Sequence, residues 1–135
     1  MRLLAIDYGE KRVGIASTDD SGSFALPRAV WPNDGTLVDK ILRLVAEGRI
    51  EKIVIGESKN LDGSINPIQK RIEAFKHELK KHLSGLAGRV EVVSHPEVFT
   101  TTEARRLQGQ TEMTDASAAA LILKSFLDTM YNREA

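Results

Sequence analysis

Three acidic residues stand at the boundaries of predicted elements, where burial alone does not explain a carboxylate. Asp7 follows the apolar run 3–6, Glu97 follows a later apolar run, and Asp115 opens a long helical pattern. Three carboxylates at one point repel each other unless a cation lies between them. Oxygen-preferring Mg²⁺, or Mn²⁺ in its place, suits such a cluster. Two such ions can align a water and stabilise the leaving oxygen in phosphodiester cleavage.

Each of these acids also has a structural explanation. Asp115 at a helix start suits a cap or a partner of the helix dipole, and Glu97, taken alone, suits a solvated loop. For Asp7 the pattern favours a functional role, because four apolar residues precede it and a buried carboxylate is costly unless something pairs with it. Glu57 is a possible additional acid, since it follows the apolar strand 52–56; the alternative is a loop acid paired with Lys59.

Basic residues follow the first acid closely enough to hold a phosphate. Lys11 and Arg12 are the predicted substrate-binding residues, although they also suit an ordinary hairpin charge pair. A second basic group lies on one predicted helix and suits either a solvated face or a nucleic-acid surface: Lys70, Arg71, Lys76, Lys80 and Lys81. Tyr8 is the aromatic residue expected in the site. His95 is close enough to Glu97 to support it or to carry a proton, with a structural role as the alternative.

The elements that must position these residues alternate along the chain. Hydrophobic periodicity and turn residues predict three strands, a helix, a strand, a helix, a strand and then helices. Their expected ranges are strands 3–6, 13–17, 24–31, 52–56 and 90–93, and helices from 33 to 48, from 66, from 100 and from 115 to about 133. The opening strands should form a meander, and the later crossovers should pair strands in parallel. We therefore expect a mixed α/β sheet with helices packed on it. Asp7 and Glu97 converge if the first and last strands are near neighbours that run the same way.

Composition narrows the class of protein. The length of 135 residues suits a single domain, residues 1–135. Lys plus Arg equals Asp plus Glu, at 19 each, which argues against an indiscriminate nucleic-acid binder. The chain contains no cysteine, which excludes thiol catalysis and fits a cytoplasmic protein. No signal pattern and no membrane-length apolar run is seen, so we expect no membrane partner.

Four motifs resemble the YqgF (RuvX-like) family of Holliday-junction-resolvase-like proteins and pre-16S rRNA nucleases. They lie at residues 7–16 (DYGEKRVGIA), 54–56 with 60–64 (VIG and NLDGS), 97–104 (EVFTTTEA) and 115–123 (DASAAALIL). The resemblance covers nearly the whole chain. It implies an RNase H-like fold, a mixed five-stranded sheet with helices on both faces, and catalytic and metal-binding roles for Asp7, Glu97 and Asp115.

Two motifs depart from the family pattern. The family usually has an Asp-Glu-Arg run where this chain has Pro96-Glu97-Val98, so a basic phosphate or carboxylate partner is missing. After the glycine of the second motif, the family usually has an apolar residue and proline, where this chain has Glu57-Ser58. Related resolvases place an acid at the end of that strand. We therefore hypothesise that Glu57 supplements the altered third motif.

These observations leave three functions to compare. The first is a Mg²⁺-dependent endonuclease that processes the 5′ end of pre-16S rRNA on a ribosomal subunit precursor, or alternatively resolves a DNA junction. The resemblance implies the preference for RNA. The second is a non-catalytic nucleic-acid-binding or ribosome-assembly factor, which the altered third motif supports. The third is an actin-like or sugar-kinase ATPase, which needs two related domains and more chain than this. Both a monomer and a homodimer remain open.

Overall fold

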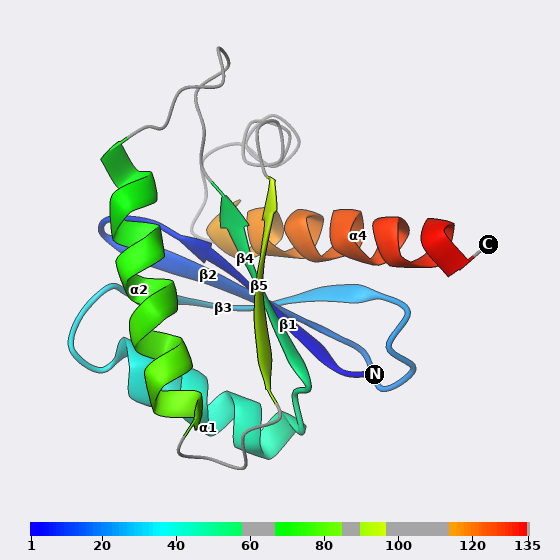
Figure 1. Cartoon of the computed structure of the whole chain (residues 1–135), viewed down its shortest axis with the longest axis horizontal. Coiled ribbons are helices and arrows are strands. Elements are labelled where there is room, and N and C mark those ends of the chain that lie inside the picture. The colour runs from blue at the N-terminus through cyan, green and yellow to red at the C-terminus, as the bar shows by residue number, and fades with distance from the viewer. Residues whose placement is uncertain (58–66, 85–89, 97–113, 135) are drawn as a thin grey trace.

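A five-stranded sheet forms the centre of the fold, and its strand order is β3-β2-β1-β4-β5 (Figure 1). The computed structural model describes residues 1–57, 67–84, 90–96 and 114–134, with the side chains of the last helix described from 116 to 130. The strands are β1 Leu3–Tyr8, β2 Arg12–Thr18, β3 Ala25–Pro32, β4 Lys52–Glu57 and β5 Glu91–Pro96. The helices are α1 Leu37–Gly48, α2 Pro67–Ser84 and α4 Thr114–Glu134.

The sheet is mixed, as predicted. β1, β2 and β3 form an antiparallel meander, whereas β1 pairs with β4 and β4 pairs with β5 in parallel. β1 and β5 therefore run in the same direction, with β4 between them. The carboxyl ends of β1, β4 and β5 consequently lie at one edge of the sheet, the usual place for a ligand site in such folds.

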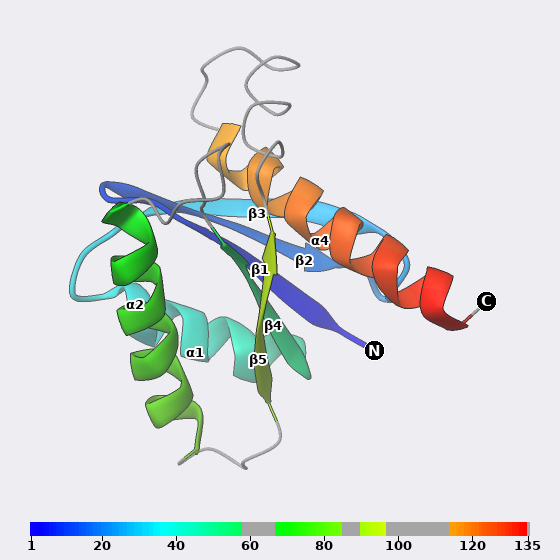
Figure 2. The same cartoon turned by 45° about the horizontal axis from the view of Figure 1, so that its top comes forward.

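Side chains alternate between two covered faces. Along β1, Leu4 and Ile6 point into a core closed by α1 and α2, while Leu3 and Ala5 point into a second core beneath α4. β4 follows the same rule, with Ile53 facing α1 and α2. Figure 2 shows α1 and α2 on one side of the sheet and α4 on the other. Burial on both faces explains why β1 and β4 read as continuous apolar runs rather than as alternating ones.

The first half of α4 is built from small residues so that the helix can lie close to the strands. Ala116, Ala118 and Ala119 are fully buried, and Ser117 is 7% exposed. From Ile122 onward, larger apolar side chains complete this second core. The predicted helix 115–133 is thus confirmed within a residue at each end.

Smaller features also follow from local sequence. Pro27 is accommodated in β3 because that strand lies at the edge of the sheet. Pro67 is the first residue of α2, where its missing N–H costs no helix hydrogen bond.

β5 is longer than the predicted strand 90–93, and the predicted helix from 100 lies outside the described residues. Within the described part of the chain, no helix combines the length and apolarity needed to cross a membrane.

Candidate active site

Asp7 lies near the end of the central strand β1, and its exposed fraction is only 9%. Its register partner on β2 is Gly14. On the other side Ile6 pairs with Ile55, so continuing the parallel register by one residue places Gly56 beside Asp7. The carboxylate is therefore flanked by a glycine on each neighbouring strand, and no side chain from either position fills the space beside it.

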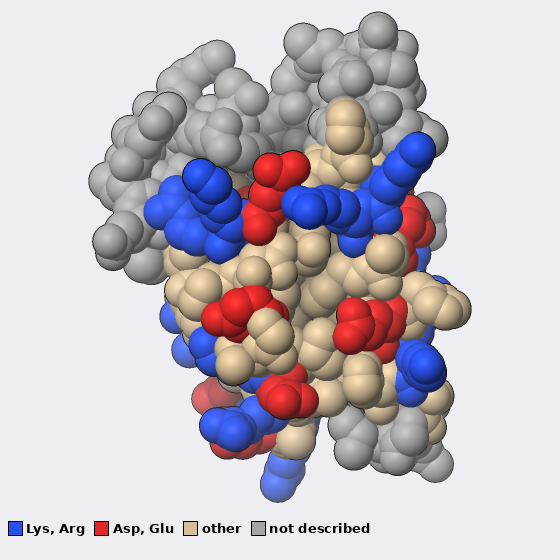
Figure 3. All heavy atoms as spheres, turned by 90° about the vertical axis from the view of Figure 1, so that its left-hand side faces the viewer, with Lys and Arg blue, Asp and Glu red and all other residues tan. Residues whose placement is uncertain are grey.

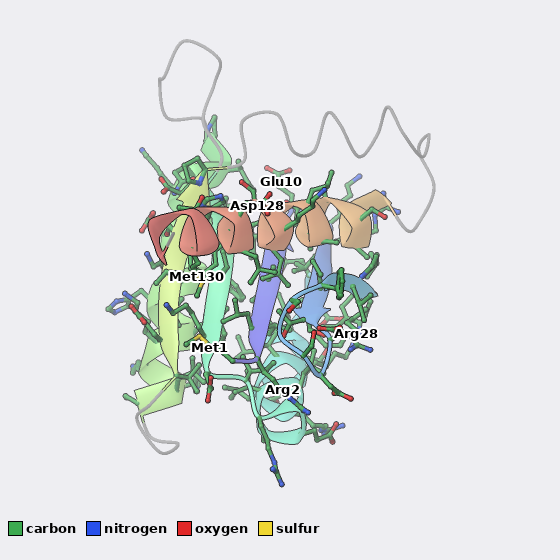
Figure 4. The ribbon with its side chains drawn as sticks, turned by 90° about the vertical axis from the view of Figure 1, so that its right-hand side faces the viewer. Met1, Arg2, Glu10, Arg28, Asp128 and Met130 are labelled. Carbon is green, nitrogen blue, oxygen red and sulfur yellow. The ribbon has the colours of Figure 1, made fainter. Side chains whose placement is uncertain are left out.

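Asp7 faces the side of the sheet that α4 covers. Every second residue of a strand points to the same face, so Asp7 shares a face with Leu3 and Ala5. Both of those residues pack beneath α4. Figure 4 shows α4 crossing the strands close to the end at which β1 and β4 stop. The buried small side chains of Ala116 and Ala118 let the start of this helix pack closely. Asp7 thus lies near the end of β1, on the face of the sheet that α4 covers.

His95 occupies the corresponding level on β5, where its register partner on β4 is Gly56. Its Nε2 atom lies 2.8 Å from the Ser125 Oγ atom of α4, and its ring meets the Phe126 ring edge-on, with centroids 5.7 Å apart. Burial lowers the pKa of His95 from its ordinary value, and the nearby charge of Glu57 opposes this effect. His95 therefore connects the end of β5 to α4. Its lowered pKa favours the neutral form of the imidazole.

Glu57 is the last residue of β4, half-buried, and in register with Pro96. Glu57 is two residues after Ile55 and four after Ile53, so its side chain leaves the strand on the face that α1 and α2 cover. It nevertheless lies at the carboxyl edge of the sheet, near enough to His95 to affect the pKa of that residue. Glu57 thus lies at the same edge of the sheet as Asp7, but on the opposite face.

The turn between β1 and β2 carries the predicted phosphate contacts. The Asn33 side chain donates from Nδ2 to the Gly9 carbonyl at 2.8 Å, and its backbone N–H donates to the Lys11 carbonyl at 2.9 Å. A Cβ on Gly9 would lie 2.5 Å from the Arg12 carbonyl oxygen, so only glycine fits there without movement. Lys11 and Arg12 are both exposed. Arg12 lies on the same face of the sheet as Asp7. It is two residues from Gly14 and so shares its face, and Gly14 is the register partner of Asp7.

Two cations of α2 have local partners. The guanidinium of Arg71 lies 3.6 Å from the Glu10 carboxylate on the β1–β2 turn. The Lys76 Nζ atom donates to the Ser94 hydroxyl at 2.7 Å, which ties the helix to β5. Figure 3 shows two groups of Lys and Arg atoms along the upper part of this side of the molecule, with acidic atoms between them. The start of α2 thus joins the turn in forming a basic region beside the sheet edge.

The prediction that Tyr8 belongs to the site is wrong. Tyr8 follows Asp7 and so points to the other face, where its ring packs on Phe75 of α2 with centroids 4.9 Å apart. It serves the core that α1 and α2 close. The sequence alone could have predicted this, because adjacent residues of a strand point to opposite faces and Tyr8 directly follows Asp7.

The side chains of two predicted catalytic acids, Glu97 and Asp115, lie outside the described part of the structure. Glu97 lies outside the described residues, directly after β5. Asp115 lies in the first turn of α4, and its side chain is not among those described. In the part of the chain that the structure describes, no three His, Asp or Glu side chains group as a metal site. The convergence of Asp7, Glu97 and Asp115 therefore stays a prediction.

Sequence reasoning missed the two glycines beside Asp7 and the place of His95 at the same level. Gly14 stands seven residues after Asp7, across a tight turn, and a hairpin register would have paired them. Gly56 and His95 need the alignment of three parallel strands, which a single sequence does not reveal.

The fold is that of RNase H-like resolvases. Thermus thermophilus RuvC, in a complex with a Holliday junction substrate, superimposes with a TM-score of 0.60 at 16% identity and covers 96% of each chain. The fowlpox virus Holliday junction resolvase gives a TM-score of 0.58 at 12% identity, covering 96% of this chain and 99% of its own. At these identities the likeness shows the fold.

A family profile described as "RuvX: Holliday junction resolvase" matches residues 1–129. A relative from Halalkalibacterium halodurans is 35% identical over 140 residues, covering 95% of this chain and 96% of the relative. Another, from Chlorobium phaeobacteroides, is 32% identical over 144 residues, covering 97% and 94%. Both carry the name "Putative pre-16S rRNA nuclease". The chain belongs to the RuvX family.

Proposed function

We propose that this protein is a metal-dependent endonuclease that cleaves phosphodiester bonds in structured nucleic acid. The observation that carries the proposal is the position of Asp7. A carboxylate that is nine-tenths buried, at the carboxyl edge of parallel strands and flanked by two glycines, has no role in packing the core. Such a group is costly to bury and suits a hard cation approached by a substrate.

The residues present fit a divalent cation of the Mg²⁺ or Mn²⁺ type, because carboxylate oxygens are its preferred ligands. Asp7 would hold the ion together with Glu97, the residue that follows β5 in the sequence, and Asp115, at the start of α4. Glu57 lies at the carboxyl edge of the sheet as a further acid. When bound, the ion supplies an activated water and charge stabilisation at the phosphate.

The protein's own groups position the substrate. Lys11 and Arg12 project from a turn that Asn33 holds in place, and they bind phosphates next to the one to be cleaved. Arg12 shares the face of Asp7, so it would approach the same strand of nucleic acid. α4 covers that face and limits access of water to the buried carboxylate.

The proposed substrate is precursor 16S rRNA, cleaved towards its 5′ end during ribosome biogenesis in the cytoplasm. The names of the two relatives support precursor 16S rRNA as the substrate class. A four-way DNA junction is the second candidate, which the description of the matching family profile favours.

The test compares cleavage of both substrates by the same protein with Mg²⁺ or Mn²⁺. We expect precursor rRNA to be cut and Asp7→Asn to abolish the cut, while Asp128→Asn, an exposed acid of α4, keeps it. Cleavage of the junction alone would replace the RNA assignment. Failure of wild-type protein to cut either substrate, with nucleic-acid binding retained, would favour the non-catalytic assembly factor.

A further inference from the structure

A groove of about 590 Å³ lies between α1 and α2, on the side of the sheet that Tyr8 faces. Its lining comes from the end of β1, the connection into α1, the first turn of α1 and the length of α2. The volume is within the range of specific ligand sites. Asp7 does not line it, so the groove is separate from the candidate active site.

The floor of this α1–α2 groove is apolar. The Tyr8 and Phe75 rings pack against each other there, and Leu37 and Val38 of α1 complete the floor. Leu37 is 2% exposed, so this surface belongs to the packed core and keeps its shape. A floor of this kind accepts an aliphatic side chain.

The walls of the groove carry an excess of acid. Asp34, Asp39 and Glu78 line it, against Arg71 and His82. Arg71 lies 3.6 Å from Glu10 outside the groove, while His82 Nε2 lies 3.8 Å from the Glu78 carboxylate within it, so Asp34 and Asp39 carry most of the excess. Hydrogen bonds from Thr36 lower the pKa of Asp34, so that carboxylate is ionised at neutral pH. Figure 3 shows Asp and Glu atoms on both sides of the uncharged middle of this face, below the basic region.

Acidic walls over an apolar floor exclude some ligands. Phosphates would be repelled, so a nucleic-acid backbone suits the basic region above rather than the groove. A metal ion would have no use for the aromatic floor. A peptide that alternates cationic and aliphatic side chains matches both surfaces, because its aliphatic groups can pack on the floor while its cations face the carboxylates.

We propose that the α1–α2 groove binds a short segment of a partner protein in which Arg or Lys stands beside an aliphatic residue. The aliphatic group packs on Tyr8 and Phe75, and the cations meet Asp39 and Glu78. The groove lies on the face of the sheet opposite Asp7, and Asn33 and Arg71 of its lining also contact the β1–β2 turn.

The experiment uses a fluorescein-labelled six-residue peptide of alternating Leu and Arg, with a Leu–Glu peptide as comparison. Fluorescence anisotropy measures binding to three forms of the full chain. These are the wild type, Asp39→Asn with Glu78→Gln, and a control with Glu47→Gln and Asp128→Asn. All four side chains are exposed, and both variants remove two negative charges. We expect the groove variant to bind the Leu–Arg peptide at least tenfold more weakly than the control, and the Leu–Glu peptide to stay unbound.

Amide NMR of the wild-type protein locates the peptide without any variant. We expect the largest shifts at Val38, Asp39, Ala74 and Glu78. The proposal is overturned if both variants lose affinity equally, or if the shifts gather at the β1–β2 turn instead. It is also overturned if a 12-nucleotide RNA or self-association of the protein shifts the groove amides while the peptide does not.

Discussion

Gly9 shows how one residue shapes the candidate site. Its backbone carries the turn from the strand of Asp7 to the strand of Arg12, and it approaches the Arg12 carbonyl too closely for any side chain. The turn is then held from outside by two hydrogen bonds from Asn33. Lys11 and Arg12 therefore project from a defined backbone, and their placement depends on a residue with no functional group of its own.

Gly9→Ala should destabilise the protein. The added Cβ forces the turn to move, and overpacking of this kind costs about 1–3 kcal/mol, which lowers Tm by several degrees in a domain of this size. Gly35→Ala is the matched control, because a Cβ there meets nothing within 4 Å. Calorimetry of both variants checks this. Equal Tm values would show that the turn adapts freely.

Glu57→Gln tests whether this acid supports the reaction. If Glu57 supplements the third motif, its neutral isostere should reduce cleavage by about 10- to 100-fold, comparably to Glu97→Gln. Glu91→Gln is the control, since Glu91 begins β5 at the opposite end of the strand and pairs with Lys52. Near-normal activity of Glu57→Gln would assign the residue to a structural role.

Asp19 gives a pH dependence of stability. Its carboxylate accepts hydrogen bonds from the Ser21 hydroxyl and the Ser23 and Phe24 backbone, with that of Ser21 foremost in lowering its pKa. A lowered folded pKa stabilises the fold above the unfolded value near 3.8, and this contribution is lost as pH falls through the folded pKa. Asp19→Asn should therefore flatten the fall in Tm below pH 4. The prediction is contradicted if Tm falls as steeply below pH 4 in Asp19→Asn as in the wild type.

Among the elements, α4 depends most on small side chains. Its first half contacts the sheet through alanines that are fully buried, and the rest of the helix carries the Ser125 contact to His95. The same helix begins with the predicted site residue Asp115 and connects through Ser125 to the end of β5. Any change in its distance from the strands acts on both.

Ala119→Leu should push α4 away from the sheet. Ala119 has no exposed surface and packs in the second core, so three added carbon atoms cost about 1–3 kcal/mol or more. Lys124→Leu, on the exposed side of the same helix, should change stability little. Urea unfolding measures both. A loss of activity larger than the loss of folded protein would show that the helix position matters to the site.

The sequence predicted most elements of the fold, because burial on both faces leaves long apolar runs in β1 and β4 and a clear stripe on α1 and α2. What it could not reveal is lateral register. The side of the sheet to which Tyr8 points, and the level shared by Asp7, Gly56 and His95, depend on strand pairings between distant segments. Those pairings depend on packing of the whole sheet rather than on any local pattern.

At the scale of the whole molecule, metal binding should appear as stability. If Asp7 helps to hold Mn²⁺, the ion binds the folded chain alone and raises Tm, with about 2.7 kcal/mol gained at a concentration 100 times Kd. Asp7→Asn should remove most of this increase, and Asp128→Asn should retain it. Differential scanning calorimetry measures the effect without any substrate. The same shift in both variants would place the ion elsewhere.

The two faces of the sheet divide the proposed functions of the molecule. The face beneath α4 holds Asp7, whereas the opposite face holds the α1–α2 groove with its acidic walls. The basic region of Lys11, Arg12 and Arg71 lies between them at the edge of the sheet. A nucleic acid at that edge and a protein segment in the groove could thus be bound together without sharing a residue beyond Arg71.

The central position of β1 has a consequence for the order in which the molecule opens. β1 is paired on both sides, while β3 is an edge strand interrupted by Pro27 and ending at Pro32. Local fluctuations start where pairing and burial are least, so amide protons of β3 should exchange with deuterium long before those of β1. The strand that carries Asp7 then keeps its protection until the sheet as a whole comes apart, and the carboxylate stays in place through every smaller opening.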